Sequence, residues 1–549
     1  MKDNLFRLQK SINNSISIQE QMIEFLLQDS DDKERKFIFR EFEAESGTKM
    51  PEKKIIKLSK ENQEQKIILF NSLASKRVDV ISLYVSEVNV KIIDENGSNL
   101  QYQINPVFQD GRIVDVKKLL IHVDLPALSL TVLKVVLDKN EDTDAIADVI
   151  TDFEDEAPFI ENPKMRLIFN ETSGFLRQIY FKNRDEMYNT EIHFSGYKST
   201  NWQSGAYLFK PEGEDKSLFS VFSQTRIIVI KGRIASDIIV FNSDLLTQAI
   251  RLYNTGTHLD NAISIVNEID FGSEDKNRNI ELIMKVKTSI NNSKNGEPEF
   301  FTDENGFQWQ PRRKVSKLGI EGNYYPITTS MFIQDDSMRL TLMTTHAQGA
   351  TSFQKGELEV MLDRRTGYDD SRGMCEGVLD SVKMQHKFLL TFEFFETVQS
   401  TENYQVPSLF VHHIINLLNH PVNMFHVDNK IDIRLHNQIE LFNYQFPCDV
   451  NLINLRSITH NELDWIPSDS ALLIMHRMGH DCQLTNENFL ELICSKNNEI
   501  RDYQITKFAK IRNVQEASLT GLKINNNIKS FHHSNMKPME IKTYYVTFS

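Results

Sequence analysis

The sequence has few cysteines and no excess of basic residues, and each absence disfavours a class of protein. Its 549 residues include four cysteines, Cys375, Cys448, Cys482 and Cys494, none in a CxxC spacing. Zinc ribbons and thioredoxin-like sites are therefore disfavoured, while disulfides and free buried thiols both stay open. The net charge of -14 argues against a nucleic-acid surface, which would need a basic stripe.

Long apolar segments are also missing. The first twenty residues lack the apolar core of a signal peptide, and no run of about 18 apolar residues occurs. We therefore expect no signal and no membrane anchor in this sequence. Glycosylation sequons occur at Asn13, Asn96, Asn170 and Asn291, but such triplets also arise by chance in an asparagine-rich chain.

The common catalytic motifs are absent as well. There is no GxSxG, HExxH, P-loop or strand-preceded GxGxxG. The pairs His412-His413 and His532-His533 are adjacent and lack the i, i+4 spacing of a helical metal site. The acidic segment 139–162 lacks the glycine and closing glutamate of a calcium loop. We predict a linker there, and no catalytic constellation or metal site in this chain.

What the sequence does contain is mostly β pattern. Apolar residues at helical spacing predict one amphipathic helix over residues 3–28, with no second long helix to pack against it. Alternating apolar runs and turn residues predict strands over most of the rest. The expected fold is mainly β, with an N-terminal helix from a truncated helical bundle. The expected regions are bundle remnant and linker (1–65), small β-sandwich (66–138), acidic linker (139–162), large antiparallel super-sandwich (163–400) and β-rich C-terminal part (401–549).

The densest polar feature is residues 363–373, which hold three arginines and three aspartates. Carboxylates and guanidiniums at this density suit either a hydroxyl-rich ligand or a buried ion-pair network. Asp369 and Asp370 point to opposite faces if extended, so they cannot flank one sugar carbon. In a turn they would accept backbone N–H groups or pair with Arg372. Aromatic faces for a sugar could come from Tyr207, Trp309, Tyr324 and Tyr325.

Several motifs occur in a fixed order with this cluster. They are Ser204–Phe209 (SGAYLF), Arg339–Leu342 (RLTL), Gly356–Val360 (GELEV), Asp363–Gly373 (DRRTGYDDSRG), His476–Cys482 (HRMGHDC) and Pro538–Ile541 (PMEI). Together they resemble the C-terminal half of the class II α-mannosidases, glycoside hydrolase family 38, and most closely its Golgi branch. The resemblance runs from about residue 66 to the end.

The resemblance implies a parent reaction, the retaining hydrolysis of α-linked mannose from N-glycans in the Golgi with zinc as cofactor. In the family, the catalytic aspartates and zinc ligands lie in N-terminal segments whose motifs are not found here. The resemblance therefore implies no catalytic residue and no bound zinc in this chain, and no activity for it alone. It implies substrate contacts from Tyr207, Asp363, Arg364, Arg365, Asp370 and Arg372. The sequence departs from the family pattern at Gly367-Tyr368 and Met374-Cys375-Glu376.

The partners that follow are a mannose-containing N-glycan, a catalytic domain not found here and helices for the stripe of residues 3–28. The alternative is a non-catalytic glycan-binding or assembly module. A polysaccharide lyase or phosphorylase super-sandwich is a weaker alternative because it does not predict the ordered motifs.

Overall fold

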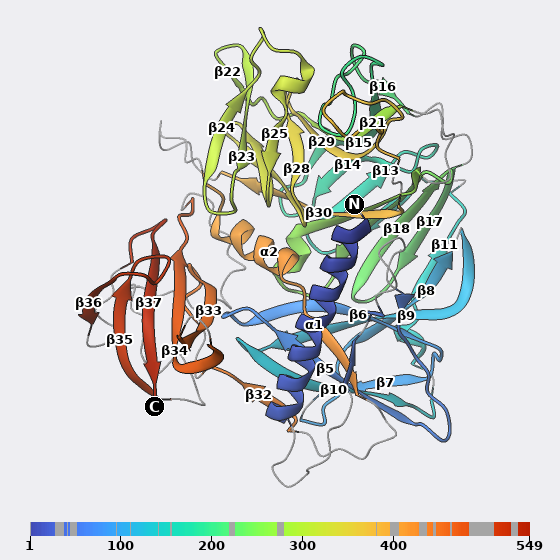
Figure 1. The fold of residues 1–549 in the computed structure, drawn as a ribbon. Helices are drawn as coiled ribbons and strands as arrows, with labels where there is room; N and C mark the ends of the chain where they lie inside the picture. Colours follow the sequence, from blue (N-terminus) through green and yellow to red (C-terminus); the bar gives the residue numbers. More distant parts are fainter. Residues whose placement is uncertain are drawn as a thin grey trace.

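The chain folds into β-rich regions crossed by one long helix (Figure 1). The computed structural model describes residues 2–27, 38–40, 42–43, 52–94, 96–109, 111–140, 142–153, 156–218, 225–271, 279–379, 382–395, 406–427, 436–442, 446–461, 464–481, 510–528 and 536–549. The abundance of strands confirms the expected fold class, mainly β with an N-terminal helix.

A small sandwich of two sheets follows the N-terminal helix in sequence. One sheet has the order β4 (Ile55–Ile56), β6 (Arg77–Val85), β9 (Arg112–Leu125), β8 (Tyr102–Gln109). The other has the order β1 (Ile38–Arg40), β31 (Asn423–Val427), β5 (Glu64–Asn71), β10 (Ser129–Leu137), β32 (Gln438–Glu440), with β7 (Val90–Ile93) also paired to β10. Strands β31 and β32 come from the far end of the chain, which a linear division at residue 138 does not anticipate. The short strands β2 (Phe42–Glu43) and β3 (Glu52–Lys53) pair with each other.

The largest sheet forms one layer of the super-sandwich. Its order is β11 (Asp148–Ile150), β17 (Thr225–Lys231), β18 (Ala235–Asn242), β19 (Leu246–Tyr253), β20 (Ala262–Ile269), β30 (Met384–Phe394), β27 (Met338–Thr344), β26 (Ser330–Gln334), β23 (Glu297–Asp303), β22 (Ser293–Lys294), with β24 (Trp309–Arg313) on β23. Its described pairs are antiparallel.

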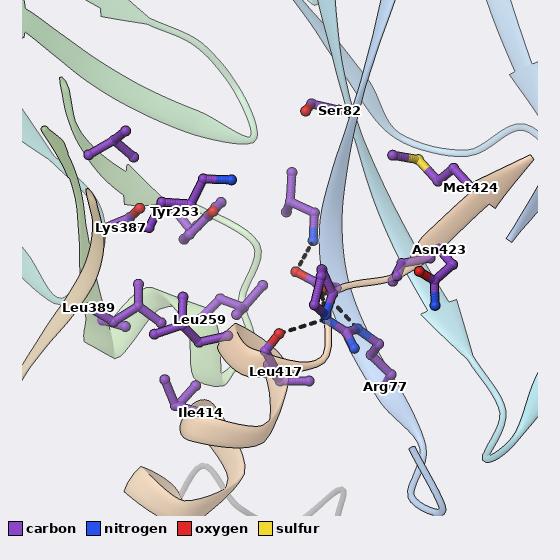
Figure 2. A pocket seen from close by; sticks show the side chains of 18 of the residues that line it. Arg77, Ser82, Tyr253, Leu259, Lys387, Leu389, Ile414, Leu417, Asn423 and Met424 are labelled. Carbon is purple, nitrogen blue, oxygen red and sulfur yellow. Dashed lines mark hydrogen bonds and ion pairs between the residues drawn. The ribbon is translucent and has the colours of Figure 1, made fainter. Parts of the chain in front are cut away.

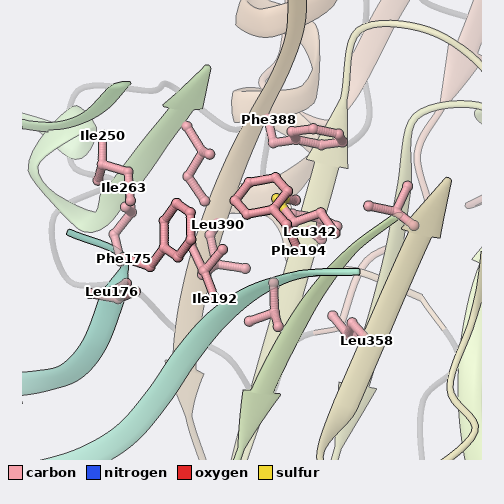
Figure 3. Close-up of a cluster of buried hydrophobic side chains, with 14 of the residues drawn as sticks. Phe175, Leu176, Ile192, Phe194, Ile250, Ile263, Leu342, Leu358, Phe388 and Leu390 are labelled. Atoms are coloured by element: carbon pink, nitrogen blue, oxygen red, sulfur yellow. The ribbon is translucent and has the colours of Figure 1, made fainter. Parts of the chain in front are cut away.

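A second sheet forms the other layer. Its order is β12 (Phe159–Glu161), β13 (Met165–Phe169), β14 (Leu176–Phe181), β15 (Glu186–Lys198), β21 (Ile280–Thr288), β29 (Glu357–Arg365), β28 (Gln348–Thr351), β25 (Tyr325–Ile327), with β16 (Lys216–Ser217) on β15. Alternate residues of both sheets fill the space between them, with Phe194 and Leu358 from one layer meeting Leu342 and Phe388 from the other (Figure 3). This apolar core fixes the strands that carry the candidate site.

Part of the expected acidic linker is built into these sheets. Within residues 139–162, β11 pairs with β17 and β12 pairs with β13, after a short 3-10 helix at Thr143–Ala145. Further 3-10 helices lie at His258–Asn261 and Ile320–Asn323.

The C-terminal region packs beside helix α2 (Leu409–Asn419). Its described strands form a sheet with the order β33 (Val450–Asn461), β34 (Asp464–Arg477), β37 (Ile541–Phe548), β35 (Ile511–Ala517), β36 (Ile524–Ile528). Ser408 begins α2, because its hydroxyl accepts the Val411 N–H at 3.1 Å. The helix buries Phe410 and Ile414 against super-sandwich residues such as Phe332. Its His412 ring nitrogen lies 2.9 Å from the Gly479 carbonyl of the C-terminal region, so the helix joins the two regions.

The predicted N-terminal helix is confirmed as α1 (Lys2–Leu27). Its C-terminal end is not orphaned, since Ile23 and Leu27 are buried against β5, β10 and β31. Farther toward the N-terminus, Leu8 is 61% exposed and Ile12 is 50% exposed. The C-terminal part of the apolar stripe is therefore packed against the small sandwich, and its N-terminal part is largely exposed to solvent. No helix among the described residues is long and apolar enough to cross a membrane.

Candidate functional site

The SGAYLF motif lies in the loop between β15 and β16, two strands of the second sheet. We call residues 199–215 the aromatic loop. Its backbone is closed by the Ser204 hydroxyl, which donates to the Lys210 carbonyl at 2.7 Å, and by the Gly205 N–H, which donates to the Leu208 carbonyl at 3.0 Å. Tyr207 is 64% exposed at the loop's outer turn. The loop thus presents an aromatic phenol from an ordered backbone.

The carboxylate of Asp370, in the polar cluster, is hydrogen-bonded to the backbone of this loop. Its Oδ2 accepts the N–H of Tyr207 at 2.6 Å and of Leu208 at 3.0 Å, while its Oδ1 accepts the N–H of Arg372 at 3.2 Å. Burial alone would raise the pKa of Asp370, but these N–H groups outweigh it and hold the pKa below its usual range. The prediction that this carboxylate accepts backbone N–H groups is confirmed.

Gly205 makes this approach possible. A Cβ on Gly205 would lie 2.4 Å from the Asp370 nitrogen, closer than real Cβ atoms come. A side chain here would push the loop away from Asp370. The glycine of SGAYLF is therefore required by a close backbone contact.

Arg364 holds the same loop from a second direction. Its Nη1 donates to the Gly205 carbonyl at 2.6 Å, and its Nε donates to Glu281 on the neighbouring strand β21. Burial raises the pKa of Glu281 to about 7 even though Arg364 opposes the shift, and the nearby Asp363 carboxylate adds to it. Asp370 and Arg364, which we call the clamp, thus fix the carbonyl and N–H groups of one turn.

The other predicted site residues, Asp363, Arg365 and Arg372, lie at different positions relative to the aromatic loop. Asp363 is half-buried and its Oδ1 accepts the Arg364 N–H at 2.7 Å. Arg365 is buried and donates to the Phe271 carbonyl at 3.4 Å, away from the loop. Arg372 is exposed beside the clamp. The structure therefore brings Tyr207, Arg364, Asp370 and the Arg372 backbone together, and it places the Arg365 side chain elsewhere.

A buried ionic network that was not predicted from the sequence lies beside the aromatic loop. The Lys285 Nζ lies 3.1 Å from Glu359 and 2.9 Å from Asp215, at the end of the loop. The Glu359 carboxylate also accepts the hydroxyls of Tyr197, at 2.9 Å, and Tyr324. Burial lowers the pKa of Lys285, but attraction to Glu359 outweighs it and the pKa is raised. Charged residues alternating with apolar ones on β21 and β29 were the available signal.

Three candidate aromatic residues have structural roles. Trp309 is buried, and its indole N–H donates to the Ser330 hydroxyl at 2.9 Å. Tyr324 donates to Glu359, and the Tyr325 hydroxyl donates to the Arg313 carbonyl at 3.1 Å. Of the four aromatic candidates, Tyr207 is the exposed one.

The residues that the structure describes do not fit a zinc ion. No group of three or more His, Cys, Asp or Glu side chains among them is arranged to hold a metal. The Nε2 of His412 lies 2.9 Å from the Gly479 carbonyl oxygen. The His413 ring packs against the His258 ring, with 4.8 Å between the ring centres. His532-His533 lies outside the described residues. We derive no zinc chemistry from these side chains.

A hollow lies away from the aromatic loop and is lined by residues of α1, α2, β6, β20, β30 and β31 (Figure 2). Its volume is about 590 Å³ and most of its lining is apolar. Its buried cation, Arg77, is matched by Asp79 at 2.7 Å and donates to the Leu417 carbonyl at 3.0 Å. None of the predicted site residues lines it.

Comparison with known proteins agrees with the motifs. Residues 160–372 match the family described as "Glycosyl hydrolases family 38 C-terminal domain". "Alpha-mannosidase 2" of Spodoptera frugiperda is 32% identical over 606 residues, covering 100% of this chain and 52% of that protein. "Alpha-mannosidase 2" of Mus musculus is 29% identical, covering 94% of this chain and 46% of that protein.

A solved structure supports the fold. An alpha-mannosidase from Enterococcus faecalis V583 covers 88% of this chain and 56% of its own, with a TM-score of 0.53 at 10% identity. The chain spans about half the length of the curated relatives it matches. Residues 160–372 therefore carry the C-terminal domain of glycosyl hydrolase family 38, and the chain corresponds to the C-terminal half of its alpha-mannosidase 2 relatives.

Proposed function

We propose that this chain is the C-terminal portion of an α-mannosidase that removes α-linked mannose from N-glycans in the Golgi. The alignment with alpha-mannosidase 2 along the whole chain supports the reaction class. The observation that carries the proposal is the exposed phenol of Tyr207, held on a loop whose backbone is fixed by Asp370 and Arg364. Such an arrangement suits recognition of a neutral, hydroxyl-rich ring.

In this proposal the described residues bind and orient the sugar. The Tyr207 hydroxyl hydrogen-bonds a mannose hydroxyl, and the exposed Arg372 guanidinium donates to others. Asp370 and Arg364 act through the loop, because their polar atoms already bind its backbone. Asp363 supports the clamp through Arg364, and Arg365 stiffens the end of β29.

The bond-breaking groups belong elsewhere in the proposal. Retaining hydrolysis needs two carboxylates about 5 Å apart on either side of the scissile bond. We place these carboxylates, and the zinc that would polarise sugar hydroxyls, in the half of the relatives with which this chain does not align. Residues 1–549 alone are then expected to bind mannosides without hydrolysing them.

Two measurements on the purified chain test the two parts. Purified chain is incubated with zinc and an aryl α-mannoside, and binding of methyl α-mannoside is followed separately by ligand-observed NMR. We expect binding that Tyr207→Phe weakens, and no turnover. Turnover that is abolished by a substitution within this chain contradicts the inactivity. Absence of mannoside binding contradicts the assigned binding role.

A further inference from the structure

The aromatic loop carries a second exposed aromatic side chain that no motif predicted. Trp202 lies five residues before Tyr207 and is 73% exposed. By contrast, Trp309 is 5% exposed and its indole N–H is bonded within the protein. Because a tryptophan contributes most to stability when buried, an indole that lies mostly in solvent adds little to the fold.

The backbone around Trp202 is held in place. The Thr200 hydroxyl donates to the Trp202 carbonyl at 2.5 Å, and the Thr200 N–H donates to the Lys210 carbonyl at 3.0 Å. The next residue, Gln203, has a φ of 65°, in the left-handed region that non-glycine residues seldom adopt. Such strain persists where the surrounding contacts enforce it, and it is concentrated at functional sites.

The exposed rings of Trp202 and Tyr207 are carried by the same hydrogen-bonded segment of the aromatic loop. Gln203 turns the chain directly into Ser204 and Gly205, which the Lys210 carbonyl and the clamp fix. The Trp202 and Tyr207 side chains therefore extend from the same hydrogen-bonded turn. An indole face offers a broad apolar surface for the C–H groups of a sugar ring, while a phenol offers a hydrogen bond.

We propose that Trp202 is a second sugar-contacting residue, which stacks on the saccharide unit next to the one bound at Tyr207. The inference rests on the proposed function and sharpens it, because it makes the chain selective for oligosaccharides over a single mannose. Trp202 then increases the affinity for glycans of two or more sugar units. It does not change the affinity for the single mannose bound at Tyr207.

The test compares two ligands on the intact chain of 549 residues. Methyl α-mannoside and a linear α-mannotriose are titrated by calorimetry or ligand-observed NMR into wild type, Trp202→Ala, Trp202→Tyr and Tyr207→Ala. Leu522→Ala, which truncates an 86% exposed side chain in the C-terminal region, is the matched control.

We expect Trp202→Ala to weaken mannotriose binding roughly threefold to tenfold, the range of a lost aromatic contact. Methyl α-mannoside binding should stay constant, and Trp202→Tyr should restore most of the mannotriose affinity. Equal losses for both ligands would show that Trp202 merely holds the loop and would overturn the inference, as would unchanged mannotriose binding. If wild type binds neither ligand, the proposed function fails together with the inference.

Discussion

Arginine and carboxylate side chains meet at two places in the protein, and they have different structural roles there. At the clamp, Arg364 and Asp370 hold a turn whose Tyr207 side chain is exposed. At the junction of super-sandwich and C-terminal region, Arg339 is fully buried, donates to Asp481 at 2.8 Å and binds the Val406 carbonyl at 2.9 Å. Dense charge by itself therefore does not distinguish an anchor for an accessible loop from a closed structural junction.

The junction is also the more closed of the two. Burial raises the pKa of Glu393 to about 7 despite the nearby Arg339 charge. The Arg339 guanidinium lies 4.5 Å from the Phe332 ring centre. The difference predicts that junction substitutions change global stability, whereas clamp substitutions change the loop.

The largest effect is expected at the junction. Arg339→Met leaves Asp481 buried without its cation, which should lower the free energy of unfolding by about 3–5 kcal/mol. Urea denaturation measures this. Arg184→Met, which removes an exposed pair with Glu186, is the control and should cost well under 1 kcal/mol. Similar losses for both variants would contradict the special contribution of the buried junction pair to stability.

A pH effect should follow from α2, which joins the same two regions. Burial lowers the pKa of His413 to about 3, and the His258 and Arg77 charges add to the shift. Between pH 6.5 and about 3 the unfolded chain binds a proton that the folded chain does not, so stability falls on acidification. His413→Leu should reduce this loss by up to about 1.4 kcal/mol per pH unit. Unfolding curves at pH 5 and 7 check the slope, and an unchanged slope contradicts the assignment.

A substitution at the clamp should lower global stability less than Arg339→Met does. It should strongly increase local opening of the aromatic loop. Gly205→Ala places a Cβ against Asp370 and should speed amide exchange of Tyr207 and Leu208 while weakening mannoside binding. Gly367→Ala is the matched control, because its Cβ would meet just the Asn279 Oδ1 at an ordinary 3.6 Å. Hydrogen exchange resolved by residue measures the effect. Loss of global stability equal to that of Arg339→Met would show that the clamp is also a structural centre.

The smallest effect is expected at the exposed pair of Lys198, just before the aromatic loop, and Glu212 within it, whose charged atoms are 2.5 Å apart. Both side chains are more than half exposed, so solvent screens their attraction. Lys198→Ala should leave the melting temperature and mannoside binding unchanged. A measurable change in either would extend the clamp to the base of the loop.

The sequence was sufficient for features that depend on local pattern. Helical spacing predicted α1, alternation predicted the β fold, and the turn at Asp369-Asp370 predicted a carboxylate that accepts backbone N–H groups. The clamp itself required pairs far apart in the chain, such as Arg364 with Gly205 and Glu281. The pair of Arg339 and Asp481, 142 residues apart, had no local signal. Burial of Trp309 and exposure of Trp202 likewise depend on tertiary packing, which single residues do not encode.

The closing of the small sandwich by β31 has a consequence for synthesis of the chain. Strand β5 is completed at one edge by β31, and the Gln65 side chain bonds to the Val427 carbonyl 362 residues away. At the usual 5–20 residues per second, β5 waits roughly 20–70 s for its neighbour. During that time an apolar strand presents an open edge, a recognised route to aggregation. A sheet whose β5 strand is made long before its β31 partner is therefore exposed to non-native strand pairing during synthesis.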